Sequence, residues 1–137
     1  MNVALLAHDR KKELMVQFCI AYCGILAGHA ISATNTTGRL VAEATGLPIS
    51  LYLSGAQGGG QQIGARIAYN EIDLILFFCD PNAPTDTLRD VEDIARLCDQ
   101  YNVPFASNVA TAEVLIRGLQ RGDMDWRDIV NPKKPTP

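Results

Sequence analysis

The segment Leu74–Cys79 constrains the fold most strongly, because it contains no polar residue. A strand with one solvated face alternates polar and apolar residues, whereas a strand covered on both faces is apolar throughout. Strands of the second kind occur in parallel sheets that are packed between helices. We therefore expect Leu74–Cys79 to be a central strand of a parallel sheet.

Four further segments have the character of strands, and segments with helical periodicity separate them. From Met15 to Tyr22, for example, apolar residues recur at the spacing of one helix face. Pro104 indicates that the last strand lies at an edge of the sheet. This alternation predicts one doubly wound α/β domain, a five-stranded parallel sheet with helices on both faces. The predicted strands are Val3–Ala7, Ala30–Ala33, Ile49–Leu53, Leu74–Cys79 and Val103–Ala106.

Size and charge exclude several classes of function. The 137 residues fit one domain, 1–137, and we expect the proline-rich residues 131–137 to be a frayed tail. The apolar runs are far shorter than the roughly 18 residues of a membrane-spanning helix. The sequence begins without a basic segment or cleavage signal, so we expect a soluble cytoplasmic protein. The net charge of −3 argues against nucleic acid or an anionic membrane as a partner.

The cysteines do not have the spacing of a metal site. Cys19 and Cys23 lie one helical turn apart, but no histidine or second cysteine pair accompanies them. Cys79 and Cys98 are isolated from each other and have apolar neighbours. We therefore expect four reduced thiols, largely in the core, and no metal.

Polar residues follow every predicted strand. In an open parallel sheet, ligands bind outside the carboxyl ends of the strands, so these residues are candidates for a site. Loops are polar in general, and the pattern alone does not establish a site. The residues are His8 and Asp9, Thr34 to Thr37, Ser54 and Gly55, Asp80, and Ser107 and Asn108.

Two of these segments resemble anion sites because each precedes a helix. At Thr36-Thr37-Gly38, free backbone N–H groups, two hydroxyls and the positive helix end can converge on one anion. The glycine-rich segment from Ser54 to Gly60 permits a close approach of the backbone to a ligand. Alternatively, Thr36 is only an N-cap and the glycines form only a flexible turn. Neither a Walker motif nor a dinucleotide-binding motif is present.

Separate blocks of the sequence, spread over almost the whole chain, closely resemble the methylglyoxal synthase family. The blocks are Ala7-His8-Asp9 with Lys12, Ala33-Thr34-Asn35-Thr36-Thr37-Gly38, Ser54-Gly55, Gly58-Gly59 with Gln61-Gln62, Phe77-Phe78-Cys79-Asp80-Pro81, Ala106-Ser107-Asn108 and Trp126-Arg127-Asp128. The resemblance implies a homohexamer that needs neither a metal nor an organic cofactor. It also implies the conversion of dihydroxyacetone phosphate to methylglyoxal and phosphate, with inhibition by phosphate.

The resemblance also implies roles for individual residues. The substrate phosphate would lie against Lys12, Thr34, Thr36, Thr37, Ser54 and Gly55, with Gly38 in the same helix start. His8, Asp9, Asp80 and Asp90 would lie near the reacting end of the substrate. Three of these residues have structural alternatives: His8 as a hydrogen-bonded core histidine, Asp80 as a turn former before Pro81, and Lys12 as a solvated helix residue.

Departures from the family pattern cluster at the predicted site. Gly60 stands where the family has the aspartate that acts as general base, and Thr87 where it has a histidine that polarises the substrate carbonyl. Asn35 and Ala56 replace a usual glycine and proline, and the loop 82–90 differs throughout. A glycine cannot accept a proton, and the loss of a general base costs on the order of 10²–10⁴ in rate. The residues expected to bind the phosphate therefore match the family pattern, whereas those expected to carry out the proton transfer differ from it.

The sequence leaves three functions open. In the leading interpretation Asp9, Asp86 or Asp90 replaces the missing base, and the protein is a carbon–oxygen lyase that acts on dihydroxyacetone phosphate. In the second, the pocket acts on another phosphorylated compound. In the third, the protein binds a phosphorylated metabolite without catalysis, as similar domains do in the regulatory part of carbamoyl phosphate synthetase. In every case we expect a small phosphorylated ligand and inorganic phosphate as partners.

Overall fold

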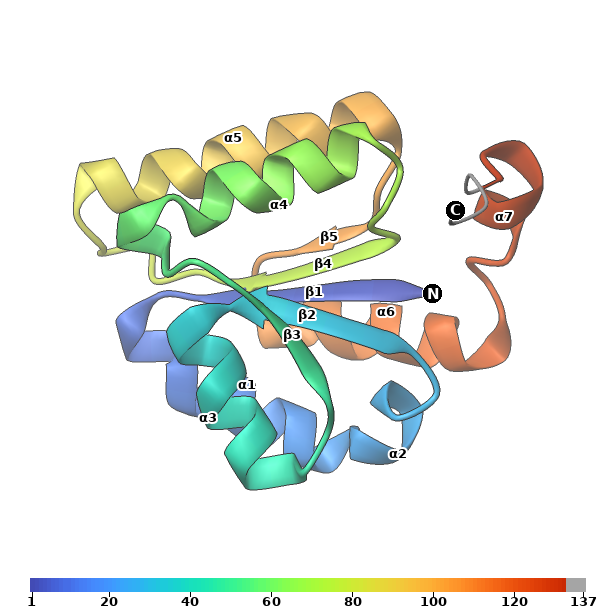
Figure 1. Cartoon of the computed structure of the whole chain (residues 1–137), viewed down its shortest axis with the longest axis horizontal. Helices are drawn as coiled ribbons and strands as arrows, with labels where there is room; N and C mark the ends of the chain where they lie inside the picture. The colour runs from blue at the N-terminus through green and yellow to red at the C-terminus, as the bar shows by residue number, and fades with distance from the viewer. Residues whose placement is uncertain (133–137) are drawn as a thin grey trace.

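Five parallel strands form one sheet in the structure, a computed structural model that describes residues 1–132 (Figure 1). Their order across the sheet is β3-β2-β1-β4-β5. This confirms the predicted doubly wound α/β fold, and each strand lies close to its predicted bounds. The strands are β1 (Asn2–Ala7), β2 (Ala30–Thr34), β3 (Ile49–Tyr52), β4 (Leu74–Phe78) and β5 (Phe105–Ala106).

The apolar strand β4 lies inside the sheet, between β1 and β5. All of its residues are buried, as the absence of polar side chains predicts. The middle position belongs to β1, however, because β2 pairs with β1 on its other side. β5 is the edge strand that Pro104 indicates, and it is shorter than expected.

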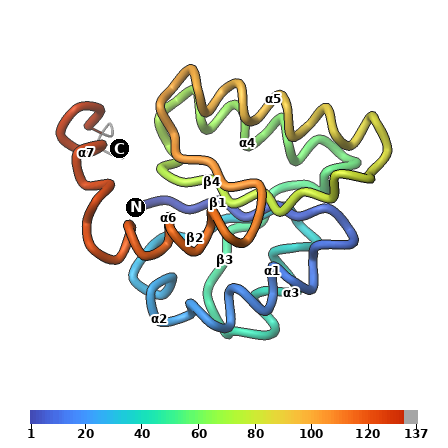
Figure 2. The backbone as a smooth tube through the Cα atoms, turned by 180° about the vertical axis from the view of Figure 1, so that it is seen from behind, coloured from blue at the N-terminus to red at the C-terminus, as the bar shows by residue number. Residues whose placement is uncertain are grey.

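Helices cover both faces of the sheet (Figures 1 and 2). On one face lie α4 (Gly59–Ala68) and α5 (Thr85–Tyr101). The other face carries α1 (Lys12–Ala21), the short α2 (Cys23–Leu26), α3 (Asn35–Thr45) and α6 (Val109–Arg121). Alternate residues of β1 enter the two cores: Val3 and Leu5 pack on the α1 side, and Ala4 and Leu6 on the α4 side.

Gly38 allows α3 to pack closely on the sheet. A Cβ atom at this position would displace the end of the Leu51 side chain on β3 and would come within 3.1 Å of the Ala33 side chain. α3 ends before Gly46, which caps the helix in the left-handed conformation with φ 74°. The start of α3 is therefore pressed against the carboxyl ends of β2 and β3.

The last helix, α7 (Trp126–Val130), is not predicted from the sequence. It lies beside the N-terminus, at the end of the sheet opposite the starts of α4 and α5 (Figure 1). Arg127 of this helix is 1% exposed, pairs with buried Asp73 at 3.3 Å, and donates to the carbonyl oxygen of Asn102. The tail predicted to fray from residue 131 lies outside the described residues from 133 onward.

The described residues contain no helix that is both long and apolar enough to cross a bilayer. All four cysteines are free thiols. Cys19 and Cys98 are buried, and desolvation raises the pKa of each to about 12. Cys23 and Cys79 are half-buried.

Candidate functional site

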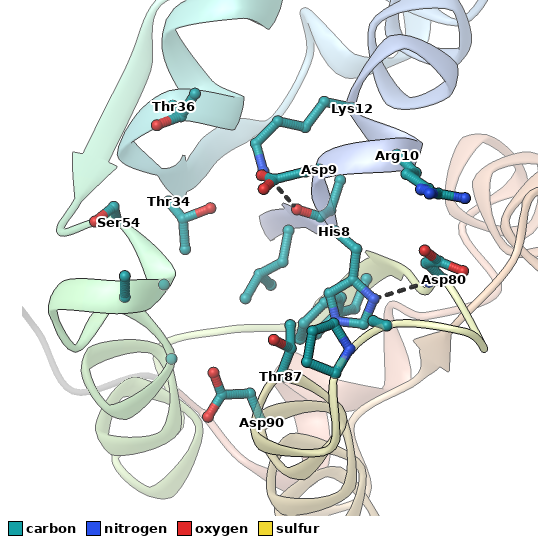
Figure 3. Close-up of a pocket in the computed structure, with 18 of the residues that line it drawn as sticks. His8, Asp9, Arg10, Lys12, Thr34, Thr36, Ser54, Asp80, Thr87 and Asp90 are labelled. Atoms are coloured by element: carbon teal, nitrogen blue, oxygen red, sulfur yellow. Dashed lines mark hydrogen bonds and ion pairs between the residues drawn. The ribbon is translucent and has the colours of Figure 1, made fainter.

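A cavity of about 910 Å³ lies at the carboxyl ends of β1 to β4, where the sequence places the candidate site. Each of these strands delivers a polar residue to its wall: His8 after β1, Thr34 at the end of β2, Ser54 after β3 and Asp80 after β4. β5 delivers none, and Asn108 instead caps α6 by accepting a hydrogen bond from the Thr111 N–H at 2.9 Å. Figure 3 shows the side chains that surround the cavity.

The start of α3 forms one side of the cavity. Thr34 occupies the N-cap position, with φ −61° and ψ 152°, so the alternative reading of Thr36 as the N-cap is wrong. The hydroxyl of Thr34 makes no capping hydrogen bond, and Thr34 and Thr36 both line the cavity. The N–H groups of the first helical turn have no partners within the helix. This end of the cavity is therefore suited to an anion.

Three neighbouring residues that the sequence assigns to the site do not line the cavity. Thr37 is 1% exposed, and its Oγ1 has no hydrogen-bond partner among the described residues. Gly38 packs on β3, as described above. The Asn35 side chain accepts a hydrogen bond from Arg39 Nε at 2.9 Å along the surface of α3. Of these three, Thr37 and Asn35 lie in the first turn, where their backbone N–H groups remain available.

The glycine-rich segment forms a defined turn at the next strand end. Gly55–Gln57 is a 3₁₀ turn, and α4 begins directly afterwards. A Cβ atom at Gly59 would collide with the carbonyl oxygen of Leu53, so only glycine fits this approach of α4 to the chain after β3. Ser54 and Gly55 line the cavity beside Thr34 and Thr36.

Lys12 lies at the same end of the cavity as Thr34 and Thr36 (Figure 3). Its Nζ donates to the carbonyl oxygen of Ala7 at 3.0 Å and to Asp9 Oδ1 at 2.8 Å. The side chain is 18% exposed, so Lys12 is not the fully solvated helix residue of the alternative reading. The hydrogen bond and charge of Lys12 lower the pKa of Asp9. Asp9 is therefore an ionised partner of Lys12 and a weak base.

His8 lies at the centre of the wall with a fixed orientation. Its Nδ1 accepts a hydrogen bond from the backbone N–H of Asp80 at 2.8 Å, so in the neutral ring the proton is on Nε2. His8 is 6% exposed, and Nε2 has no partner among the described residues. The residue is thus a buried, hydrogen-bonded histidine with one donor left over for a ligand.

Asp80 has a structural role as well as a place in the cavity. Its Oδ1 accepts a hydrogen bond from the backbone N–H of Asn82 at 2.9 Å, the turn-forming arrangement expected before Pro81. Its own N–H fixes His8. Asp80 therefore orients both the histidine and the loop that follows β4.

Asp90 lies on α5, on the side of the cavity where Figure 3 also places Thr87. Burial raises the pKa of Asp90, the charge of Asp93 raises it further, and His8 lowers it. A Cβ atom at Gly60 would lie 3.7 Å from Asp90 Cγ and 3.9 Å from each carboxylate oxygen. The carboxylate of Asp90 thus faces the position from which the general base of the family pattern would project.

The sequence reasoning missed Arg10, which lines the cavity. Figure 3 shows it near Asp80, away from Ser54. Its position directly after His8 and Asp9 is the only sequence signal for this role. Within residues 1–132, His, Cys, Asp and Glu side chains form no group of three or more that could hold a metal ion.

Comparison with known proteins gives consistent matches. A family model described as the MGS-like domain matches residues 15–107. Methylglyoxal synthase of Caldicellulosiruptor saccharolyticus is 58% identical over 133 residues, which cover 97% of this chain and 94% of that protein. Methylglyoxal synthase of Geobacillus thermodenitrificans is 53% identical over 131 residues, which cover 96% of this chain and 91% of that protein.

A solved structure has the same fold. The crystal structure of methylglyoxal synthase from Elizabethkingia anophelis NUHP1 matches this chain with a TM-score of 0.77 at 30% sequence identity. The match covers 99% of this chain and 93% of that one. The similarity therefore extends over the whole sheet and both helix layers.

Proposed function

The chain belongs to the methylglyoxal synthase family, and we propose that it is a lyase that converts dihydroxyacetone phosphate to methylglyoxal and phosphate, with Asp90 as the general base. The observation that carries this proposal is the geometry at Gly60. The Asp90 carboxylate, whose pKa burial raises, lies within 4 Å of the point where a side chain at residue 60 would begin.

The phosphate of the substrate would bind at the start of α3. Free N–H groups of the first turn, the hydroxyls of Thr34, Thr36 and Ser54, and the ammonium group of Lys12 surround this end of the cavity. Such groups match the charge and the acceptor oxygens of a phosphate. The backbone at Gly55 leaves room for close approach.

The reaction requires a base near the carbon beside the carbonyl, on the side away from the phosphate. Asp9 is paired with Lys12 and its pKa is lowered, and Asp86 is exposed in the first turn of α5. Asp90 is the lining carboxylate whose pKa burial raises, which brings its basicity closer to what proton abstraction needs. Asp90 is therefore the replacement that the geometry favours among the candidates.

The Nε2–H of His8 is suited to the developing enediolate oxygen. A neutral imidazole that is fixed through Nδ1 can donate one hydrogen bond without reorganisation. In the following step the C–O bond to phosphate breaks, and the phosphate leaves with the bonding electrons. The enol product then converts to methylglyoxal, so no oxidant, metal or cofactor is required.

A second candidate is a module that binds a phosphorylated metabolite without catalysis. The absence of a side chain at Gly60, and of an ionisable group at Thr87, favours it over an efficient synthase. A lyase for another phosphorylated substrate is the remaining alternative. All of these candidates share the phosphate end of the cavity, where Thr34, Thr36, Ser54 and Lys12 lie. They differ at the reacting end, where Gly60, Thr87 and Asp90 lie.

The deciding experiment supplies the purified protein with dihydroxyacetone phosphate and measures methylglyoxal and released phosphate together. Equal amounts of both products support the proposal, provided that Asp90→Asn abolishes them. Neither product, with inorganic phosphate still raising the melting temperature, supports the binding module. A homohexameric state and inhibition by phosphate are further parts of the proposal. Light scattering and initial rates at several phosphate concentrations test them.

A further inference from the structure

The cavity is larger than a triose phosphate requires. At about 910 Å³ it lies near the upper end of the ~300–1,000 Å³ of pockets that hold drug-sized ligands. The wall at Gly60 carries no side chain, and a methyl group there would lie in ordinary contact with Asp90, 3.7 Å from its Cγ. The volume of the cavity, with no side chain at residue 60, leaves space beside the carbon from which Asp90 would take the proton.

The groups around this space are suited to hydroxyl groups. The loop after β4 and the first turns of α5 contribute Asn82, Asp86 and Thr87 to the wall. Amide, carboxylate and hydroxyl side chains donate to and accept from a sugar hydroxyl. A hydroxylated chain fits this end better than an aliphatic one.

We infer that the site also accepts 1-phosphorylated ketoses with a longer chain than dihydroxyacetone phosphate. The phosphate binds at the start of α3, and the additional carbons extend past Gly60 toward Asn82, Asp86 and Thr87. This inference rests on the proposed lyase function, because it uses the same base and the same leaving group.

The chemistry balances without a co-reactant. Asp90 takes the proton from the CHOH carbon next to the carbonyl, and the electrons of that C–H bond form the enediolate. The C–O bond to phosphate then breaks, and phosphate leaves with the electron pair. The resulting enol takes up a proton at the terminal carbon and becomes a 1-deoxy-2,3-diketone. One ketose phosphate thus gives one dicarbonyl compound and one phosphate.

The test uses erythrulose 1-phosphate beside dihydroxyacetone phosphate. Its chain is too short to close a stable ring on the ketone, so the reactive open form is the one present. Released phosphate and the dicarbonyl, trapped with o-phenylenediamine, are measured for both substrates. We expect kcat/KM for erythrulose 1-phosphate to be within about tenfold of that for dihydroxyacetone phosphate. A value more than about 100-fold lower overturns the inference alone. No product from either substrate overturns the proposed function and this inference with it.

A matched pair of variants locates the additional carbons. Gly60→Ala adds a methyl group facing Asp90 at ordinary contact distance, so the fold is retained. We expect it to lower the kcat/KM ratio of erythrulose 1-phosphate to dihydroxyacetone phosphate by about fivefold or more. Gly55→Ala adds a methyl group at the phosphate end with nothing within 4 Å, so both substrates should change by the same factor. An unchanged ratio in Gly60→Ala, or a lower ratio in Gly55→Ala, contradicts the proposed position of the chain.

Discussion

The two ends of the cavity differ in what they are made of. The phosphate end consists mainly of backbone, namely the start of α3 and the turn before α4, together with hydroxyl groups and the ammonium group of Lys12. The reacting end consists mainly of side chains, several of them ionisable, and the carboxyls around the cavity differ in environment. Lys12 lowers the pKa of Asp9, whereas burial raises the pKa of Asp90.

Because of this difference, the groups proposed to bind phosphate and the groups proposed to react lie at separate ends of one cavity. Backbone groups are fixed by the fold, and single substitutions leave them in place. Side chains at the reacting end can change one at a time, as Gly60 and Thr87 illustrate. Under the proposed function, such a site would retain its affinity for phosphate while its rate or its substrate changes.

The largest effect is expected for Asp90→Asn. If Asp90 is the base, the variant should lose on the order of 10²–10⁴ in kcat. Phosphate should still raise its melting temperature as in the parent protein, because the start of α3 is unaltered. Asp99→Asn removes a charge from the exposed face of α5, outside the cavity, and should keep the parent rate. A full rate in Asp90→Asn would assign the base to another residue.

The next effect is expected at the phosphate end, for Lys12→Met. A charge-assisted hydrogen bond contributes about 1.5–3 kcal/mol, so KM for dihydroxyacetone phosphate and Kd for phosphate should rise roughly 10- to 100-fold. Titrating the melting temperature with phosphate and measuring initial rates give the two constants. Lys11→Met removes a neighbouring charge that does not line the cavity and serves as the control. An unchanged Kd in Lys12→Met would mean that α3 and the hydroxyls hold the phosphate alone.

Sequence predicted the fold because the signals for it are local. β4 and residues Val3–Ala7 of β1 are short apolar runs, and Gly46 marks the end of α3. Helix α7 could not be predicted in this way. Its anchor, the buried pair of Arg127 with Asp73, joins residues 54 positions apart and depends on tertiary packing.

The sequence predicted which residues gather at the candidate site better than it predicted which of them face one another. The strand-end rule places His8, Thr34, Ser54 and Asp80 around one cavity, as observed. The same rule says nothing about which carboxylate faces Gly60. That proximity arises because α4 packs against α5, and no spacing in the sequence encodes it.

A moderate effect is expected when a carboxylate is restored at residue 60. In Gly60→Asp the new Cβ atom would lie 3.7 Å from Asp90 Cγ, so the two carboxylates would be close neighbours. Like charges this close titrate as a pair, and one of the two pKa values is raised. We expect kcat to rise about tenfold at pH values where the pair can accept a proton. Gly60→Asn has the same size without a base and should bring no gain. An unchanged rate in Gly60→Asp would mean that the altered loop 82–90 limits the reaction.

The smallest effect is expected for Asp93→Asn, in the pH profile alone. The proposed base Asp90 would act only when ionised, so the rate should fall as the pH falls through its pKa, which lies above that of an ordinary aspartate. Removing the Asp93 charge lowers this pKa, and the acidic limb of kcat/KM should move to lower pH. The limb should not reach the position of an ordinary carboxyl, because burial is the larger cause. Asp93 lies outside the cavity, so the plateau rate should stay the same. If Asp90→Asn inactivates the protein but Asp93→Asn leaves the acidic limb in place, the pH profile reports the titration of another group.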